Sequence, residues 1–126
     1  MLARVKGPSQ DVCTDTTGKR DVRSGSIVGG AFDEATSAWG TKRKGVPPQN
    51  VRLYWVPLHA QKMPGVTVVA HNAGTGTTVK VINRDYGDAE QWKYYNTDFV
   101  LLEPGEWQVR VTAGPDSGCF LMTLKD

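Results

Sequence analysis

The strongest structural signal in this chain is a strict alternation of apolar and polar residues near its C-terminus. The alternating residues are Trp107, Gln108, Val109, Arg110, Val111, Thr112 and Ala113. A period of two is the pattern of a strand with one buried face. The sequence Gly-Pro-Asp-Ser-Gly at 114–118 is typical of a turn, and an apolar-rich run resumes at Cys119. This part of the chain is therefore predicted to form a β-hairpin that closes an antiparallel sheet.

Further strand signals recur through the second half of the chain. They lie at 51–56, 65–71, 77–83 and 95–102, and they are separated by short turn-like segments. With Ser24–Phe32 they give about seven strands, roughly 8–15 residues apart, which predicts an all-β antiparallel β-sandwich. The expected core residues are Trp55, Val68, Val81, Phe99, Leu101, Trp107, Val109, Val111, Phe120, Met122 and Leu124.

The first fifty residues differ in composition from the rest of the chain. A chain of 126 residues has the length of one domain, but residues 1–50 are poor in apolar residues. They are predicted to form an extended, irregular N-terminal arm with one possible strand at Ser24–Phe32 and a single helical turn at 33–39. Residues 51–126 are predicted to form the sandwich core. The arm is expected to wrap the domain's own sheet or to pack on a neighbouring subunit. Trp39 is expected to anchor the arm in a groove.

Charge and hydropathy exclude two classes of partner. The formal net charge is +2, with 15 basic and 13 acidic residues interspersed, and the only local basic cluster is Lys42–Lys44. A nucleic-acid binder usually carries a basic stripe, so nucleic acid is not expected as a partner. No stretch has the roughly 18 consecutive apolar residues of a membrane span, so no membrane insertion is expected. Residues 1–8 lack the apolar core of a signal peptide, which fits a cytoplasmic protein or a secreted one whose signal peptide Met1 replaces.

The two cysteines are the sequence feature that bears on the redox environment of the protein. Cys13 lies in the predicted arm, and Cys119 starts the last predicted strand. A disulfide between them is favoured over two buried thiols, and it would imply an oxidising compartment. Phe120 shares its face with Met122 and Leu124, so Cys119 is expected on the opposite face, where the arm would have to lie for Cys13 to reach it.

Two segments near the C-terminus resemble a known class of domain. They are Pro104-Gly-Glu-Trp-Gln-Val-Arg-Val and Gly118-Cys-Phe-Leu-Met-Thr-Leu, which are similar to the closing strands of immunoglobulin-like bacterial extracytoplasmic domains. The resemblance covers about 25 residues. It implies an immunoglobulin-like build and a cell-surface setting, and it carries no catalytic residues. The chain departs from antibody domains in lacking their paired core cysteines.

An aromatic cluster is the candidate ligand-binding site. Trp92, Lys93, Tyr94 and Tyr95 are consecutive, and aromatic rings with polar neighbours suit sugars and protein hot spots. In an extended segment Trp92 and Tyr94 share one face, with Tyr95 opposite. Two interpretations stay open: a recognition surface, or rings that line the core and cover a sheet edge.

Other candidate sites are weaker. Asp85, Asp88 and Glu90 form a calcium candidate, although their spacing is not that of an EF-hand loop. His59 and His71 are the only imidazoles, and no serine lies in a nucleophile elbow. We therefore expect no enzyme activity and no cofactor.

Two functions are compatible with these features. The first is a non-catalytic extracytoplasmic binding module of a bacterial surface protein or lipoprotein that recognises a glycan or protein. The alternative is a structural assembly subunit, such as a phage decoration protein or a filament protomer in a virion or extracellular filament. Its N-terminal arm would contact neighbours in a homo-oligomer by strand addition. The absence of a signal peptide favours the alternative.

Overall fold

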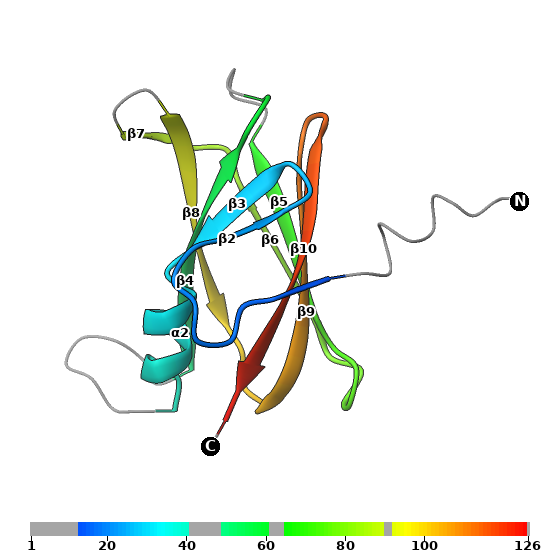
Figure 1. Ribbon diagram of the computed structural model, residues 1–126. Coiled ribbons are helices and arrows are strands. Elements are labelled where there is room, and N and C mark those ends of the chain that lie inside the picture. Colours follow the sequence, from blue (N-terminus) through cyan, green and yellow to red (C-terminus); the bar gives the residue numbers. More distant parts are fainter. Residues whose placement is uncertain (1–12, 41–48, 61–64, 90–91, 126) are drawn as a thin grey trace, which may run out of the picture.

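The computed structural model describes residues 13–40, 49–60, 65–89 and 92–125, which form two five-stranded sheets (Figure 1). The two sheets bury one shared hydrophobic cluster, so the predicted all-β sandwich is confirmed. The described residues contain ten strands where about seven were expected. They contain no helix long and apolar enough to span a membrane.

The first sheet holds the predicted C-terminal hairpin. Its strand order is β1 (Thr14–Asp15), β10 (Asp116–Leu124), β9 (Gly105–Ala113), β5 (Val66–Asn72) and β6 (Thr78–Asn83). All neighbours are antiparallel except β1, which runs parallel to β10. Asp116 pairs with Ala113, so the hairpin turns through the two residues between them.

The second sheet carries the other face of the core. Its strand order is β2 (Val22–Ser24), β3 (Ile27–Gly30), β4 (Asn50–Pro57), β8 (Trp92–Val100) and β7 (Gly87–Ala89), and every neighbouring pair is antiparallel. In both long strands, β4 and β8, buried residues alternate with more exposed ones. Each strand therefore has one inner and one outer face.

The N-terminal segment is more regular than its composition predicts. Residues 14–40 supply β1 to one sheet, β2 and β3 to the other, and helix α2 (Phe32–Ala38) beside them (Figure 1). Ser24–Phe32 is not one strand, because Ser24 pairs with Ile27 across a two-residue turn and the helix begins at Phe32. Short strands need few apolar residues of their own when they pair with the longer strands of a sheet, as β1 does with β10 and β3 does with β4. The segment predicted as an irregular arm is thus part of the sandwich over residues 14–40.

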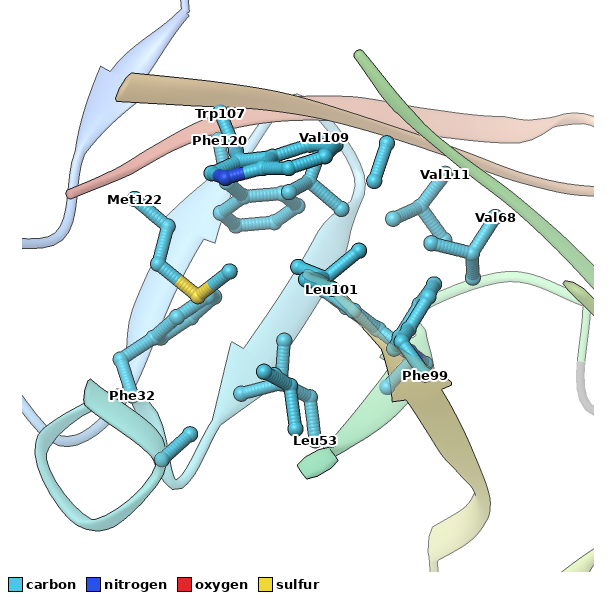
Figure 2. Packing of buried hydrophobic residues seen from close by; sticks show 14 of the residues in the cluster. Phe32, Leu53, Val68, Phe99, Leu101, Trp107, Val109, Val111, Phe120 and Met122 are labelled. Carbon is cyan, nitrogen blue, oxygen red and sulfur yellow. The ribbon is translucent and has the colours of Figure 1, made fainter. Parts of the chain in front are cut away.

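The core contains almost all of the residues expected there. Ten of the eleven are buried, and Val81 is partly buried against the cluster. Figure 2 shows Phe32 reaching from the helix into the same cluster as Phe120 and Met122. The Phe32 ring centroid lies 5.9 Å from that of Trp55 and 5.6 Å from that of Phe120. Helix α2 is therefore anchored by an aromatic contact to both sheets.

Two further contacts fasten the N-terminal segment to the sandwich. Cys13 and Cys119 form a disulfide with their Cα atoms 4.6 Å apart, which confirms the predicted bond. Cys119 lies beside Arg110 of β9, on the face opposite the core residue Phe120. The Trp39 indole N–H donates a 2.8 Å hydrogen bond to the carbonyl oxygen of Leu101, so Trp39 anchors this segment on its own domain.

Candidate recognition surface on the second sheet

The outer face of strands β4 and β8 brings together side chains that are distant in sequence. On β4, Tyr54 lies between buried Leu53 and Trp55; on β8, Tyr94 precedes buried Tyr95. Because alternate residues of a strand point to opposite faces, Tyr54 and Tyr94 share the outer face. Their ring centroids are 6.4 Å apart in an edge-to-face arrangement. Trp92 lies two residues before Tyr94 and therefore on the same face of β8. We call Tyr54, Tyr94 and Trp92 the aromatic face.

Two glycines make room for the tyrosine rings. Gly30 of β3 pairs with Tyr54, and Gly87 of β7 pairs with Tyr94. A Cβ atom at residue 30 would overlap the end of the Tyr54 ring, and one at residue 87 would lie 2.6 Å from Cζ of Tyr94. Each ring therefore extends over the neighbouring strand, in the space that a side chain would otherwise fill.

The Tyr54 hydroxyl is fixed by a carboxylate. It donates a hydrogen bond to Oδ1 of Asp21, which precedes strand β2. Partial burial together with this acceptor raises the pKa of Tyr54 to about 12. The phenol therefore stays protonated at neutral pH, and the hydrogen bond holds the ring across β3.

Charged groups beside the aromatic face are paired. Arg52 donates two hydrogen bonds to Asp98, of 2.9 and 3.0 Å, across the β4–β8 pair. These bonds lower the pKa of Asp98. Near Asp21, Arg20 forms ion pairs with Asp33 at 3.4 Å and with Glu34 at 3.2 Å. Charged side chains therefore stand beside the rings. The Arg52–Asp98 pair is neutral, whereas Arg20 with Asp21, Asp33 and Glu34 leaves a net negative charge near Tyr54.

The four residues predicted to bind a ligand do not all lie on this surface. Trp92 is 39% exposed and Tyr94 is half-buried on the outer face. Tyr95 is only 1% exposed and is part of the core, so it cannot contact a partner there. Lys93 contacts Asp88 at 2.7 Å and lies 4.6 Å from the Tyr86 ring centroid. Trp92 and Tyr94 thus remain as candidate contacts, and Tyr54 joins them.

No described contact brings the carboxylates of the calcium candidate together. Asp88 binds Lys93, while the backbone N–H of Asp85 donates to Asn83. Glu90 lies outside the described residues. Within 13–40, 49–60, 65–89 and 92–125, no three His, Cys, Asp or Glu side chains are placed to hold a metal ion.

A second polar cluster, which the sequence did not predict, surrounds Asp116. Its side chain is fully buried and accepts hydrogen bonds from the backbone N–H groups of His59, at 2.9 Å, and Ala60, at 2.6 Å. Oδ1 also lies 2.7 Å from Nδ1 of His59. Burial alone would raise the pKa of Asp116, but these bonds and one from Ser26 outweigh it and lower the pKa to about 2.

This cluster holds two loops together. The carboxylate fixes the segment after β4 to the start of β10, and the His59 side chain is 71% exposed. A carboxylate that orients an imidazole is also part of a catalytic triad. A triad further needs a nucleophile in contact with the imidazole, and the described contacts of His59 include none. His71 lies elsewhere, with its Nδ1 2.8 Å from the Thr78 hydroxyl.

A hollow of about 200 Å³ lies between the β1–β2 turn, helix α2 and the end of β10. It is smaller than the roughly 300–1,000 Å³ of most ligand pockets. Most of the residues that line it carry a hydroxyl group, namely Thr16, Thr17, Thr36, Ser37 and Thr123. Gly18 and Lys125 complete the lining.

Comparisons of the chain with protein-family models, curated proteins and solved structures found no match. The aromatic face is the strongest candidate, because it combines exposed ring surface with ordered polar neighbours. Sequence parity could identify Tyr94 and Trp92, whereas Tyr54 joins them only through the pairing of β4 with β8.

Proposed function

We propose that this protein is a non-catalytic, extracytoplasmic binding module of a bacterial surface protein or lipoprotein that recognises a glycan or protein partner through its aromatic face. The observation that carries the proposal is the arrangement of Tyr54 and Tyr94 over glycines, with Trp92 on the same side of β8. Aromatic rings bury much area on contact and lose little rotamer freedom. A fixed, partly exposed group of them suits recognition.

The strand order supports an immunoglobulin-like build. Strands β3, β4, β8 and β7 follow the order A-B-E-D of that fold, and β10, β9, β5 and β6 follow G-F-C-C′. The chain visits them in the same sequence as the lettered strands. Such sandwiches present rigid sheet faces and loops for recognition, which agrees with a binding role.

The disulfide supports an extracytoplasmic setting. Structural disulfides persist in oxidising compartments and are uncommon in the cytosol. The Cys13–Cys119 bond joins the described N-terminal end of the chain to a central strand pair. A bond that fastens an element of the fold in this way favours a secreted protein or a protein on the cell surface.

The alternative, an assembly subunit that contacts neighbours through its N-terminal arm, has less support. Residues 14–15 pair with β10, and residues 22–30 form a hairpin in the second sheet of the same chain. Strand addition to a neighbour would have to use other parts of the predicted arm. No described contact favours it over the binding module.

Binding to bacterial cell-envelope fragments tests the proposed function. The purified protein is sedimented with the fragments beside the double variant Trp92→Ala/Tyr94→Ala. The matched control is Ile82→Ala, because Ile82 is 52% exposed on β6 of the opposite sheet. We expect the double variant to lose at least about tenfold in affinity, since two ring contacts are removed, and the control to bind like wild type. Equal binding by all three proteins would refute a role for the aromatic face.

A further inference from the structure

We propose that the ligand of the aromatic face is an uncharged polysaccharide, an inference that rests on the proposed function and narrows it. The first argument is the shape of the surface. The ends of the Tyr54 and Tyr94 rings occupy the positions above Gly30 and Gly87, so both side chains extend along the sheet. Side chains that extend along a sheet leave a shallow surface, which fits a chain of sugar rings. The two ring planes are inclined by 76°, so such a chain would contact the rings one at a time and not as one flat platform.

The chemistry of the ring faces agrees with this shape. The face of an aromatic ring is the negative part of its quadrupole. The C–H bonds on one side of a pyranose carry partial positive charge, so a sugar ring can lie against Trp92 or Tyr94. Asn96 follows on the outer face of β8, where it is exposed and pairs with Tyr54. Its amide can both donate to and accept from sugar hydroxyls.

The charge pattern favours an uncharged ligand over an anionic one. Arg52 is paired with Asp98, and Arg20 with Asp33 and Glu34. Next to Trp92 in sequence, Lys93 is paired with Asp88. The Arg52–Asp98 and Lys93–Asp88 pairs are neutral, and Arg20 is outnumbered by Asp21, Asp33 and Glu34. The surplus charge beside the rings is therefore negative and does not attract an anionic polymer.

The same pairs argue against a protein partner. The centre of a protein–protein interface is depleted of charged residues. Here the Arg52–Asp98 pair lies next to the Tyr54–Asn96 pair in the same two strands, so charges stand directly beside the rings. Paired, hydrogen-bonded charges are instead compatible with a hydroxyl-rich ligand, because each remains able to share a hydrogen bond with a sugar.

The distribution of tryptophans allows a direct binding assay. The chain has four tryptophans, and three of them, Trp39, Trp55 and Trp107, are 5%, 0% and 0% exposed. Trp92 is 39% exposed. Quenching of the intrinsic fluorescence by acrylamide therefore reports mainly on Trp92, and a ligand that covers the aromatic face protects it.

The probes are three uncharged polysaccharides (laminarin, mannan and amylose), the anionic polygalacturonate, and unfolded casein as a protein. We expect at least one uncharged polysaccharide to lower the quenching constant about twofold or more, because the accessible indole becomes covered. Trp92→Phe should remove this response. Asn96→Ala changes an exposed side chain and leaves the rings in place. It should lower the affinity for the protecting polysaccharide about tenfold, as expected for the loss of one good polar contact.

The possible outcomes separate this inference from the proposed function. Protection by casein or polygalacturonate alone, lost in Tyr94→Ala, would overturn the uncharged polysaccharide and leave a recognition surface in place. Protection by no probe would overturn the uncharged polysaccharide, while sedimentation with envelope fragments would still decide the recognition role. A response that persists in Trp92→Phe, and that Tyr94→Ala and Asn96→Ala leave unchanged, would come from another tryptophan, place the ligand elsewhere and refute both. Circular dichroism shows whether each variant is folded. If Tyr94→Ala does not fold, the result for Asn96→Ala decides between these outcomes.

Discussion

The buried carboxylate of Asp116 should make the stability of this protein depend on acid pH in a way that one substitution can isolate. Its oxygens accept hydrogen bonds from the backbone of His59 and Ala60 and from the His59 ring. Asp116→Asn preserves the shape of the side chain but removes its charge. The amide NH₂ group also cannot accept the hydrogen bonds that one of the carboxylate oxygens accepts.

The size of the effect follows from the pKa difference between the two states. Folding lowers the pKa of Asp116 from 3.8 to about 2, and each unit is worth about 1.4 kcal/mol. The charged form is favoured in the folded protein, so its contribution is complete above the unfolded pKa and is lost as the pH falls through the folded pKa. Between pH 6 and pH 2 the wild type should lose about 2 kcal/mol of unfolding free energy through Asp116.

Urea unfolding followed by tryptophan fluorescence at pH 6 and pH 2 measures this contribution. Other carboxylates, such as Asp98, titrate in both proteins and cancel in the difference between wild type and Asp116→Asn. That difference should shrink by about 2 kcal/mol from pH 6 to pH 2. His59→Ala is the control, because it removes a mostly exposed ring and keeps both backbone donors. A difference between wild type and Asp116→Asn that does not change with pH would refute the reasoning.

Three further predictions concern stability and local geometry. Replacing Cys13 and Cys119 by serine opens a loop with a sequence separation of 106 residues; it should cost up to about 4.7 kcal/mol of unfolding free energy, and an unchanged urea midpoint would contradict this. Trp39→Phe removes a buried hydrogen bond to the backbone and should cost about 1–3 kcal/mol in the same assay, whereas a cost near zero would mean that the bond does not anchor the helix. Gly30→Ala should displace the Tyr54 ring from the carboxylate that holds it, so an absorbance titration should show the tyrosine pKa of about 12 move toward 10; no change would show that the ring does not depend on the glycine.

The C-terminal strands were predictable because their signal is local. Apolar residues alternate without interruption along β9, so parity alone assigns Trp107, Val109 and Val111 to the core. The hairpin turn is likewise encoded by adjacent residues. Val81 follows the same pattern but lies on β6, which is hydrogen-bonded to a neighbour on one side only, and it is therefore only partly buried.

The N-terminal segment was harder to predict because tertiary contacts create its structure. Strands of two to four residues carry too few apolar residues to show a period. Helix α2 has seven residues, and isolated helices of that length are unstable in water. Phe32 stabilises it by packing against Trp55 and Phe120, contacts that no local pattern records.

The candidate site could be predicted only in part, because some of its residues are adjacent in sequence and others meet only through strand pairing. Parity places Tyr94 and Trp92 on one face and Tyr95 on the other, yet parity alone does not say which face is the core. Tyr54 is distant in sequence, and only the register between β4 and β8 brings it beside Tyr94. The role of Gly30 also depends on strand pairing, because its partner Tyr54 lies on a different strand.

Hydroxyl-radical footprinting tests the central claim most directly. The protein is oxidised free and bound to bacterial cell-envelope fragments, and the oxidation of each residue is read by mass spectrometry. Recognition through the aromatic face predicts that binding protects Trp92 and Tyr94, which are exposed and half-buried in the free protein, while Ile82 on the opposite sheet stays as reactive as before. Protection of Ile82 with Trp92 and Tyr94 unprotected would contradict the claim and place recognition on the other sheet.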